Sequence, residues 1–344
     1  MKTEIKVLKA GHGDCILINT YNDKLEKFNI LIDGGTVETF ANSLKNELEK
    51  IDKINLLVLT HIDSDHIGGI NKFIKSDLFD NIEIEKFWLN CANLIRIGSG
   101  GKISYSQGKT LEEILISKKI PAQKWNEKVV YKNQYDIDGV RFQILSPTSE
   151  ILNELFKKWP LISNVEDSSL TNRKISSSEV FSSKSLPEIA KEEFSAKNSV
   201  NSDLFNSSSI AFILSTFDCS FLLLGDARAE VIVSSLLDLG HSTDEKLKVD
   251  YVKVSHHGSK NNTSCDLLDL IECDNFIIST NGGSSKNKHP DRETIARIIY
   301  HPKRDLLKKR HIYFNYPIKK ILERCGKIFE AKDFENGNWE IHEL

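Results

Sequence analysis

The chain has 344 residues, of which 40% are hydrophobic and 28% are charged, and its formal net charge is −3. A chain of this length and composition can bury one large core, which favours a single α/β sandwich over two independent domains. The near balance of charges excludes a global electrostatic attraction to nucleic acid.

Membrane and export signals are missing from the sequence. No apolar run approaches the roughly 18 residues that a membrane span requires, and the N-terminal residues lead directly into a strand. We therefore expect no transmembrane helix, no signal peptide, no membrane partner and a cytoplasmic location. The six cysteines are scattered without paired spacing, which is typical of reduced, buried thiols and not of a disulfide frame or a zinc knuckle.

The first part of the chain alternates apolar runs with glycine-containing turns. We predict strands near residues 3–9, 14–19, 28–33, 54–60, 83–90, 128–131 and 140–146. A helix over 36–51 is indicated by apolar side chains at helical spacing. These side chains are Phe40, Leu44, Leu48 and Ile51.

Asp14 and Asp33 lie in glycine-flanked turns after two of these strands. A carboxylate in such a turn can accept the free ring N–H of a metal-ligating histidine and fix its tautomer. The alternative is a turn aspartate that accepts a hydrogen bond from its own backbone.

Four metal-competent side chains occur within six residues directly after the apolar run 54–59: His61, Asp63, Asp65 and His66. A regular helix or strand cannot aim four such groups at one point, but a loop that leaves the C-terminal end of a strand can. This spacing predicts a metal site.

A helix is predicted over 67–74, directly after the four candidate ligands. Gly68 and Gly69 are expected to let the backbone turn tightly into this helix. The alternative to a metal site is a solvated turn in which Ser64 or Asp65 caps the helix.

The stretch 149–205 differs from the rest of the chain, because it is rich in Ser, Asn and Lys and has few regularly spaced apolar residues. We interpret it as an insertion within the single domain 1–344. It is either a lid over the site or a flexible surface excursion.

The last part of the chain returns to apolar runs. Strands are predicted near 209–216, 219–225, 249–255 and 275–279, with helices near 227–238, 263–271 and 291–299. Two of the strands end in ligand types, since Asp226 follows one and His256 and His257 follow another. In α/β sheets sites assemble at such strand ends. Asp226 could instead cap a helix, and either histidine could be a satisfied loop residue.

The chain resembles the metallo-β-lactamase superfamily and, within it, the hydrolase domain of the DNA-uptake channel ComEC and its stand-alone soluble relatives. The residues that carry the resemblance are 7–15, 31–35, 61–66, 144–147, 206–209, 224–226, 256–259 and 289–290. It implies an αββα sandwich of two mixed sheets flanked by helices.

Two departures from the usual superfamily pattern bear on the metal. Asp63 stands where the common motif has a histidine, and no histidine lies between His66 and His241 to act as the isolated third histidine ligand. ComEC-like relatives share the aspartate. A carboxylate in place of an imidazole makes the first site harder, and one ligand fewer makes it more open. Both changes favour manganese or magnesium relative to zinc. We expect two divalent ions, Mn²⁺ or Zn²⁺, with Mg²⁺ as a further alternative.

Such a centre supports hydrolysis, because two ions about 3.5–4 Å apart can hold the attacking and leaving oxygens of an ester. We assign His61 and Asp63 to one ion, and Asp65 and His66 to the other. Asp226 is the expected bridge.

His256 is expected to complete the coordination of the second ion, although the alternation of side chains along a strand does not decide between His256 and His257. His257 and His289 then remain for proton donation to the leaving oxygen or for binding a phosphate, and Asp65 is expected to take part in catalysis. His289 could instead only cap the helix that Pro290 starts.

Four further residues are candidate substrate contacts: Asn206, Ser259, Lys309 and Arg310. The last two belong to a C-terminal cationic segment interleaved with aromatic residues, which suits single-stranded nucleic acid. Its cations are Lys303, Arg304, Lys308, Lys309, Arg310, Lys319 and Lys320. The alternative is an exposed helix face followed by a buried strand.

Three functions fit this pattern. The first is a nuclease or phosphodiesterase that acts on DNA or a related nucleotide, in bacterial defence or DNA processing. The second is a hydrolase of a small molecule, such as a cyclic nucleotide, phosphocholine ester, lactone or thioester. The third is an interaction subunit regulated by a protein partner in a multi-subunit system. The oligomeric state is open.

Overall fold

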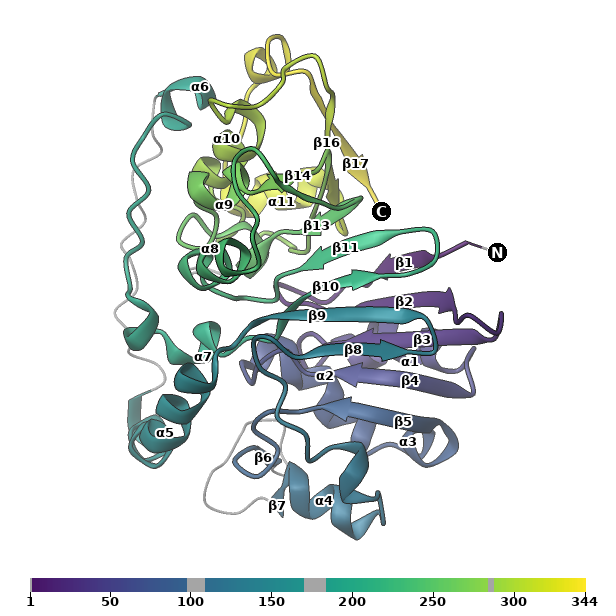
Figure 1. Ribbon diagram of the computed structural model, residues 1–344. Coiled ribbons are helices and arrows are strands. Elements are labelled where there is room, and N and C mark those ends of the chain that lie inside the picture. Colours follow the sequence, from purple (N-terminus) through teal and green to yellow (C-terminus); the bar gives the residue numbers. More distant parts are fainter. Residues whose placement is uncertain (1, 98–108, 170–183, 284–287) are drawn as a thin grey trace.

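The computed structural model describes residues 2–97, 109–169, 184–283 and 288–344. Two β-sheets face each other and helices cover their outer faces, which confirms the predicted αββα sandwich (Figure 1). Both sheets are mixed.

Within the described residues, the first sheet has five strands in the order β1-β2-β3-β4-β5. They are β1 (Glu4–Val7), β2 (Ile16–Tyr21), β3 (Lys27–Ile32), β4 (Lys53–Val58) and β5 (Glu83–Trp88). The pairs β3/β4 and β4/β5 are parallel, so the C-terminal end of β4 lies at the same edge as those of its neighbours.

The second sheet, counted over the same described ranges, has eight strands in the order β17-β16-β15-β13-β11-β10-β9-β8. They are β8 (Gln134–Ile137), β9 (Val140–Ser146), β10 (Ala211–Ser215), β11 (Ser220–Leu223), β13 (Tyr251–Lys253), β15 (Asn275–Ile278), β16 (Arg310–Phe314) and β17 (Trp339–Glu343). Neighbours are parallel from β17 to β11 and antiparallel from β11 to β8. Two short ladders join β6 (Arg96–Ile97) to β7 (Lys109–Thr110) and β12 (Leu247–Lys248) to β14 (Ile271–Glu272).

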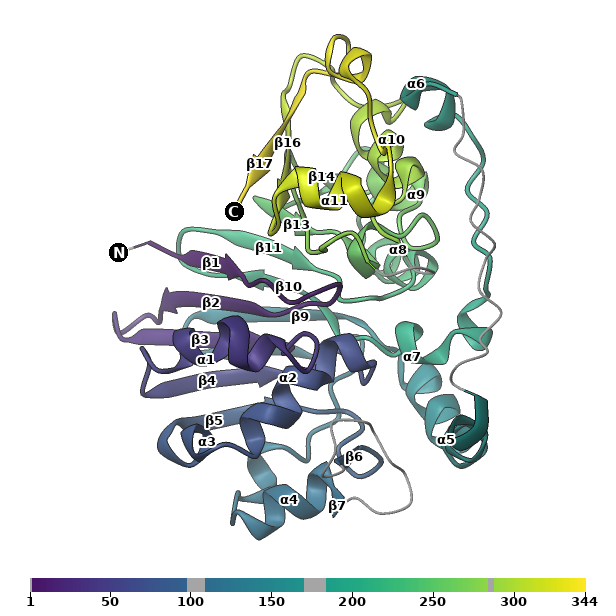
Figure 2. The same cartoon turned by 180° about the vertical axis from the view of Figure 1, so that it is seen from behind.

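Helices fill the outer layers, with α1 and α2 lying across the first sheet in Figure 2. The α-helices are α1 (Lys45–Leu48), α2 (Ser64–Ile74), α3 (Asp77–Asn81), α4 (Leu111–Ser117), α5 (Ser149–Ser169), α6 (Leu186–Ile189), α7 (Leu204–Ser207), α8 (Ala229–Asp238), α9 (Cys265–Asp269), α10 (Arg292–Tyr300) and α11 (Ile318–Cys325). Short helical turns are η1 (Phe40–Leu44), η2 (Ala122–Lys124), η3 (Val200–Ser202), η4 (Ser255–Gly258) and η5 (Ala331–Phe334). No helix in these described ranges has the length and apolar character needed to cross a bilayer.

Side-chain alternation along the central strands produces the layers. In β3, Ile30 faces the second sheet and Leu31 faces the helices. In β11, Leu223 faces the first sheet and Leu222 faces the opposite helices. Because both faces of these strands are buried, their sequences are continuous apolar runs, which is why they could be recognised.

The strand predicted over 128–131 is wrong, since that segment is irregular and the strand lies at Gln134–Ile137. β8 and β9 form a hairpin in which Ile137 pairs with Val140. The two intervening residues, Asp138 and Gly139, both have positive φ, 51° and 86°. That conformation suits a two-residue hairpin turn and sets the register.

The stretch 149–205 stays a predicted insertion, and part of it, 170–183, lies outside the described residues. Its first helix, α5, is anchored, because Leu152, Leu155 and Trp159 are buried in the core of the first sheet. Trp159 meets Phe205 of α7 edge to face at 5.7 Å. This part of the stretch is therefore packed and not a surface excursion.

Candidate metal centre

The loop between β4 and α2 carries the four adjacent candidate ligands. His61 and Asp63 lie in the loop, whereas Asp65 and His66 lie in the first turn of α2. Asp63 occupies the N-cap position with φ −62° and ψ 147°, yet its side chain makes no capping hydrogen bond. The capping alternative to a metal site is therefore not what this loop shows.

Glycines bring the neighbouring turns against this helix. Gly68 and Gly69 lie inside α2, so their expected role in the turn before it is wrong. A Cβ added at Gly69 would lie 1.9 Å from the carbonyl oxygen of Gly34, and one at Gly13 would lie 1.7 Å from that of Asp65. Real Cβ atoms do not approach this closely, so these positions require glycine for backbone contact.

Asp33, at the end of β3, orients two of the histidines. Its Oδ2 accepts the Nδ1–H of His66 and the hydroxyl of Thr60, each at 2.7 Å. Because the single Thr60 hydroxyl proton is used in this way, Thr60 Oγ1 must accept from His61 Nδ1 at 3.2 Å. In their neutral form both histidines therefore carry the lone pair on Nε2.

Asp226 follows β11 at the turn after Gly225, which has φ +50°. The Asp226 backbone N–H donates to Ser209 Oγ at 3.2 Å, and its carbonyl accepts from Asn262 Nδ2 at 3.0 Å. The side chain is 3% exposed. These contacts fix a buried carboxylate between the two sheets.

His256 and His257 follow β13 in the turn η4. Both are left-handed, with φ 48° and 56°, a conformation that costs free energy in residues other than glycine and that clusters at functional sites. His257 Nδ1–H donates to the carbonyl of Ser279 at 3.0 Å, and His256 Nδ1–H donates to Asn262 Oδ1 at 3.1 Å. Each ring consequently turns Nε2 toward Asp226.

Four imidazoles converge on one carboxylate oxygen, Asp226 Oδ2. The distances from their Nε2 atoms are 3.4 Å for His66, 3.7 Å for His256, 3.7 Å for His257 and 3.8 Å for His61. Asp65 Oδ2 lies 3.5 Å from His257 Nε2, and Asp63 Oδ2 lies 3.8 Å from His61 Nε2. Residues separated by two hundred positions in sequence thus meet at one point.

Several of these atoms are buried without a hydrogen-bond partner: Nε2 of His61, His66 and His257, and Oδ1 of Asp226. Buried polar atoms are normally satisfied, so a cluster of nitrogen and oxygen atoms without partners fits a bound cation. Donor triads within 4.8 Å include His61, His66 and Asp226; Asp65, His66 and His257; and Asp14, Asp226 and His257. Imidazole and carboxylate donors fit zinc and manganese alike.

The geometry favours His257 over His256 as the ligand. His257 joins two donor triads and is buried, whereas His256 belongs to none among the described residues and its side chain is 28% exposed. The geometry thus differs from the expectation that His256 completes the coordination of the second ion. The physical reason is the consecutive left-handed pair, which breaks the alternation that strand reasoning assumes.

The charges of the cluster shift its pKa values. Burial lowers the pKa of His66, but Asp226 and Asp33 raise it well above its ordinary value. Burial raises the pKa of Asp226, but the imidazoles of His66, His256 and His257 bring it well below its ordinary value. The carboxylate is therefore ionised and ready to bind a cation.

Lys253 is a site residue that sequence reasoning missed. Its side chain is 1% exposed, and its ammonium pairs with the equally buried Asp14 and donates to the carbonyl of Gly225 at 3.2 Å. Asp14 Oδ1 in turn lies 3.5 Å from His257 Nδ1. Asp14 therefore lies beside the ring of His257, but the His257 Nδ1–H donates to Ser279 and Asp14 Oδ1 makes no hydrogen bond. The available signal was a lysine within an apolar strand.

The turn that carries Asp14 is held by the C-terminal half of the chain. Asn315 Nδ2 donates to the carbonyl of Leu8 at 2.7 Å, and Ser279 Oγ donates to that of Gly13 at 2.8 Å. The Gly11 backbone N–H donates to Tyr316 Oη at 2.9 Å.

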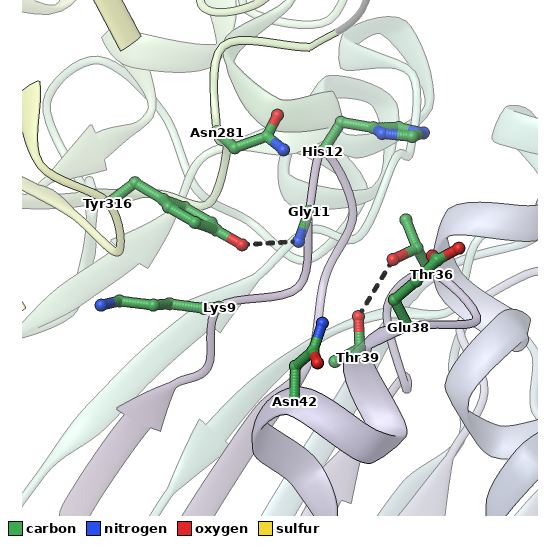
Figure 3. A pocket seen from close by; sticks show the side chains of 9 residues that line it. All are labelled: Lys9, Gly11, His12, Thr36, Glu38, Thr39, Asn42, Asn281 and Tyr316. Carbon is green, nitrogen blue, oxygen red and sulfur yellow. Dashed lines mark hydrogen bonds between the residues drawn. The ribbon is translucent and has the colours of Figure 1, made fainter. Parts of the chain in front are cut away.

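A cavity of about 290 Å³ opens beside this turn (Figure 3). Its wall includes Lys9, His12, Glu38, Asn42, Asn281 and Tyr316. His12 Nε2 lies 3.8 Å from Asp65 Oδ2, so this side chain links the cavity to the centre. No role was assigned to His12 from the sequence, although it shares a turn with Asp14.

His289 lies at the outer side of the cluster. Its ring centroid is 5.4 Å from that of His256, and its Nδ1 is 3.3 Å from Asp291 Oδ2. The side chain is 18% exposed. A partly solvated imidazole held by a carboxylate can exchange a proton with water and with a bound molecule.

The predicted substrate contacts are placed unequally. Ser259 and Asn206 are buried near the ends of η4 and α7, where Asn206 Nδ2 donates to Asp203 Oδ2 at 3.2 Å. Arg310 is corrected, because its guanidinium is buried against Phe276 and donates to a backbone carbonyl. It cannot reach a substrate phosphate from there.

The C-terminal cationic segment is largely paired with acids. Lys303 contacts Asp269 at 2.7 Å, and Lys308 contacts Glu272 at 3.1 Å. Lys309 contacts Glu340, and Arg304 donates only to backbone carbonyls. Five of the seven cations are therefore engaged within the fold, whereas Lys319 and Lys320 are exposed on α11.

Residues 8–88 match the family model of the metallo-beta-lactamase superfamily. No curated protein matches the chain by sequence. Similar solved structures include the metallo-beta-lactamase fold protein YhfI from Bacillus subtilis, with 8% identity over 99% of this chain and 96% of that chain and a TM-score of 0.42. CmlA, a diiron beta-hydroxylase from Streptomyces venezuelae, has 10% identity over 100% of this chain and 54% of that chain, with a TM-score of 0.40. A HARLDQ-motif mutant of a metallo-beta-lactamase from Cronobacter sakazakii has 12% identity over 73% of this chain and 79% of that chain, with a TM-score of 0.35. The two mixed sheets with their flanking helices are the metallo-β-lactamase fold.

Proposed function

We propose that this protein is a metal-dependent hydrolase that cleaves phosphodiesters in DNA or a related nucleotide. The observation that carries the proposal is the convergence around Asp226 of buried nitrogen and oxygen atoms without hydrogen-bond partners. Such a donor set between two sheets has no structural need of its own, because buried polar groups without partners destabilise a fold.

The donor triads suggest which residues hold each ion. His61, His66 and Asp226 surround one position, with Asp63 Oδ2 3.8 Å from His61 Nε2, and Asp65, His66 and His257 surround the other. When bound, divalent ions supply Lewis acidity that activates water and neutralises charge on a phosphoryl group. Asp226 lies within 3.8 Å of ligands of both sets, which supports its role as the bridge.

The protein side chains around the centre supply orientation and proton transfer. Asp33 and Thr60 hold His61 and His66 in the required tautomer. His289 is a candidate proton donor to a leaving oxygen, because its side chain is partly exposed to solvent and its Nδ1 lies 3.3 Å from a carboxylate oxygen of Asp291.

The choice of a phosphodiester rests on the donor set and the resemblance. Asp63 replaces the usual second histidine, and a carboxylate-rich first site favours manganese or magnesium, the usual ions of phosphoryl transfer. The sequence resemblance to the hydrolase domain of ComEC, which is associated with DNA degradation, supports the same class.

A second candidate is the hydrolysis of a small molecule. Two observations favour it, the cavity of about 290 Å³ beside Asp65 and the pairing of the C-terminal cations with acids. A nucleotide-sized molecule can occupy such a cavity, whereas a long DNA strand needs an unpaired cationic track.

The test is a cleavage panel on the full chain loaded with Mn²⁺ or Zn²⁺. Cleavage of plasmid or single-stranded DNA supports the nuclease, and turnover of bis(p-nitrophenyl) phosphate or a cyclic dinucleotide without DNA cleavage supports the small-molecule enzyme. The Asp65→Asn/His66→Ala variant should lose at least about 100-fold in rate, because even indirect support of a metal ligand is worth about 10–100-fold. His241→Ala, at a half-buried histidine outside the centre, is the matched control. Full activity of the double variant would refute the assignment.

A further inference from the structure

We propose that His311, Glu340 and His342 form a separate site for one transition-metal cation of the zinc class, on the C-terminal strands of the second sheet. β16 and β17 are parallel neighbours, and His311 lies opposite Glu340. Because strand side chains alternate, His342 projects on the same face as Glu340. All three side chains are half-buried, so a cation can enter from solvent.

The donor atoms form a tight triangle. His311 Nδ1 lies 2.9 Å from His342 Nε2 and 2.8 Å from Glu340 Oε1, and His342 Nε2 lies 3.1 Å from the same oxygen. Ligands about 2.0–2.1 Å from a zinc-sized ion are separated by about 3.0 Å in octahedral and 3.4 Å in tetrahedral geometry. The triangle is already close to a coordination shell.

Hydrogen bonding alone cannot satisfy this triangle. Each ring nitrogen carries at most one hydrogen, and the carboxylate carries none. If both rings donate to Glu340 Oε1, the N–H groups of His311 Nδ1 and His342 Nε2 face and repel each other. If one ring donates to the other, the lone pair of the accepting nitrogen faces the carboxylate oxygen and is repelled by it. A cation at the centre satisfies all three atoms at once.

Neighbouring side chains hold the donors in place. Lys309 pairs with Glu340 Oε2, which leaves Oε1 for the two imidazoles. The Tyr313 ring stacks on His342 with centroids 4.6 Å apart and an interplanar angle of 19°. Supporting contacts of this kind orient metal ligands.

Two imidazoles and one carboxylate suit zinc, cobalt or nickel better than magnesium or calcium, which take oxygen ligands. The site draws on β16 and β17 and shares no residue with the centre around Asp226. Its expected role is to tie the edge strand β17 to β16, and this role is independent of the proposed hydrolysis.

The experiment measures zinc per chain by equilibrium dialysis and elemental analysis, in the Asp65→Asn/His66→Ala background that weakens the main centre. Adding His342→Ala should remove one equivalent of Zn²⁺ and abolish a zinc-dependent rise in Tm, whereas adding His241→Ala should do neither. Glu340→Gln, which preserves side-chain shape, should weaken zinc binding in the same background and keeps the test valid if the alanine variant unfolds.

Equal zinc content with and without His342→Ala and Glu340→Gln would overturn the proposal. In the otherwise unchanged chain, His342→Ala should leave the rate of phosphodiester cleavage unaltered. A loss of cleavage that follows the loss of this zinc would also overturn it, since the site would then not be separate.

Discussion

The substitution Lys253→Met removes the cation that compensates a buried carboxylate. Lys253 and Asp14 are each about 1% exposed, and their ion pair lies between β13 and the first turn of the chain. Methionine keeps the length and apolar stem of the lysine. The substitution leaves the Asp14 carboxylate buried without its cation, and Asp14 Oδ1 already lacks a hydrogen-bond partner.

The expected cost follows from this burial. Removing one partner of a buried pair destabilises by about 3–5 kcal/mol, because the other charge stays desolvated. An unfolding entropy of about 2.1 cal/mol/K per residue gives roughly 0.7 kcal/mol/K for 344 residues. The melting temperature should therefore fall by about 4–7 °C. The exposed ion pair of Lys248 with Glu272 is worth only about 0–1 kcal/mol, so Lys248→Met is the matched control.

Differential scanning calorimetry on the single variants and on Asp14→Asn/Lys253→Met measures this cost. The double variant should recover most of the lost stability, because the unpaired charge is gone, and the cycle should give a coupling of at least about 2 kcal/mol. A Lys253→Met protein that melts like Lys248→Met would refute the reasoning. So would a double variant whose loss equals the sum of the single losses.

Three further outcomes are expected. His257→Ala should lower the metal content by about one equivalent, as read by elemental analysis, whereas His256→Ala should retain it; the reverse order would contradict the ligand assignment. Burial lowers the pKa of His257, but Asp226 and Asp14 raise it to about 9, so the metal-free imidazole is protonated at neutral pH and a cation must displace that proton. Metal affinity should consequently rise with pH up to about 9, with proton release visible by titration calorimetry in buffers of different ionisation enthalpy; a pH-independent affinity would contradict it. Burial raises the pKa of the Cys91 thiol to about 12, so its labelling by Ellman's reagent at pH 8 should be slow until denaturant is added, and stoichiometric labelling of the native chain at Cys91 within seconds would contradict this.

Apolar runs made the sandwich and the loop at His61 readable from sequence. β3, β4 and β11 are buried on both faces, so their composition alone marks them as central strands. Ligand types placed directly after such strands then indicate where a site assembles.

Local backbone geometry and pairing were not readable in the same way. The left-handed conformations of His256 and His257 could not be foreseen, and with them the geometry favours His257 over His256 as the ligand. The burial of Arg310 and Lys253 depends on partners far along the chain, a backbone carbonyl in α10 and Asp14 respectively. Composition treats such cations as surface residues because most of them are.

The bonds that tie the first turn to the end of the chain set an order of events during synthesis. The hydrogen bond from Gly11 to Tyr316 cannot form until the 305 residues that separate them have been synthesised. A ribosome that adds about 5–20 residues per second needs roughly 15–60 s for this. Until then a nascent chain cannot seat Asp14 beneath His257. The centre is therefore assembled late in synthesis, and a translation product truncated before Tyr316 should be inert.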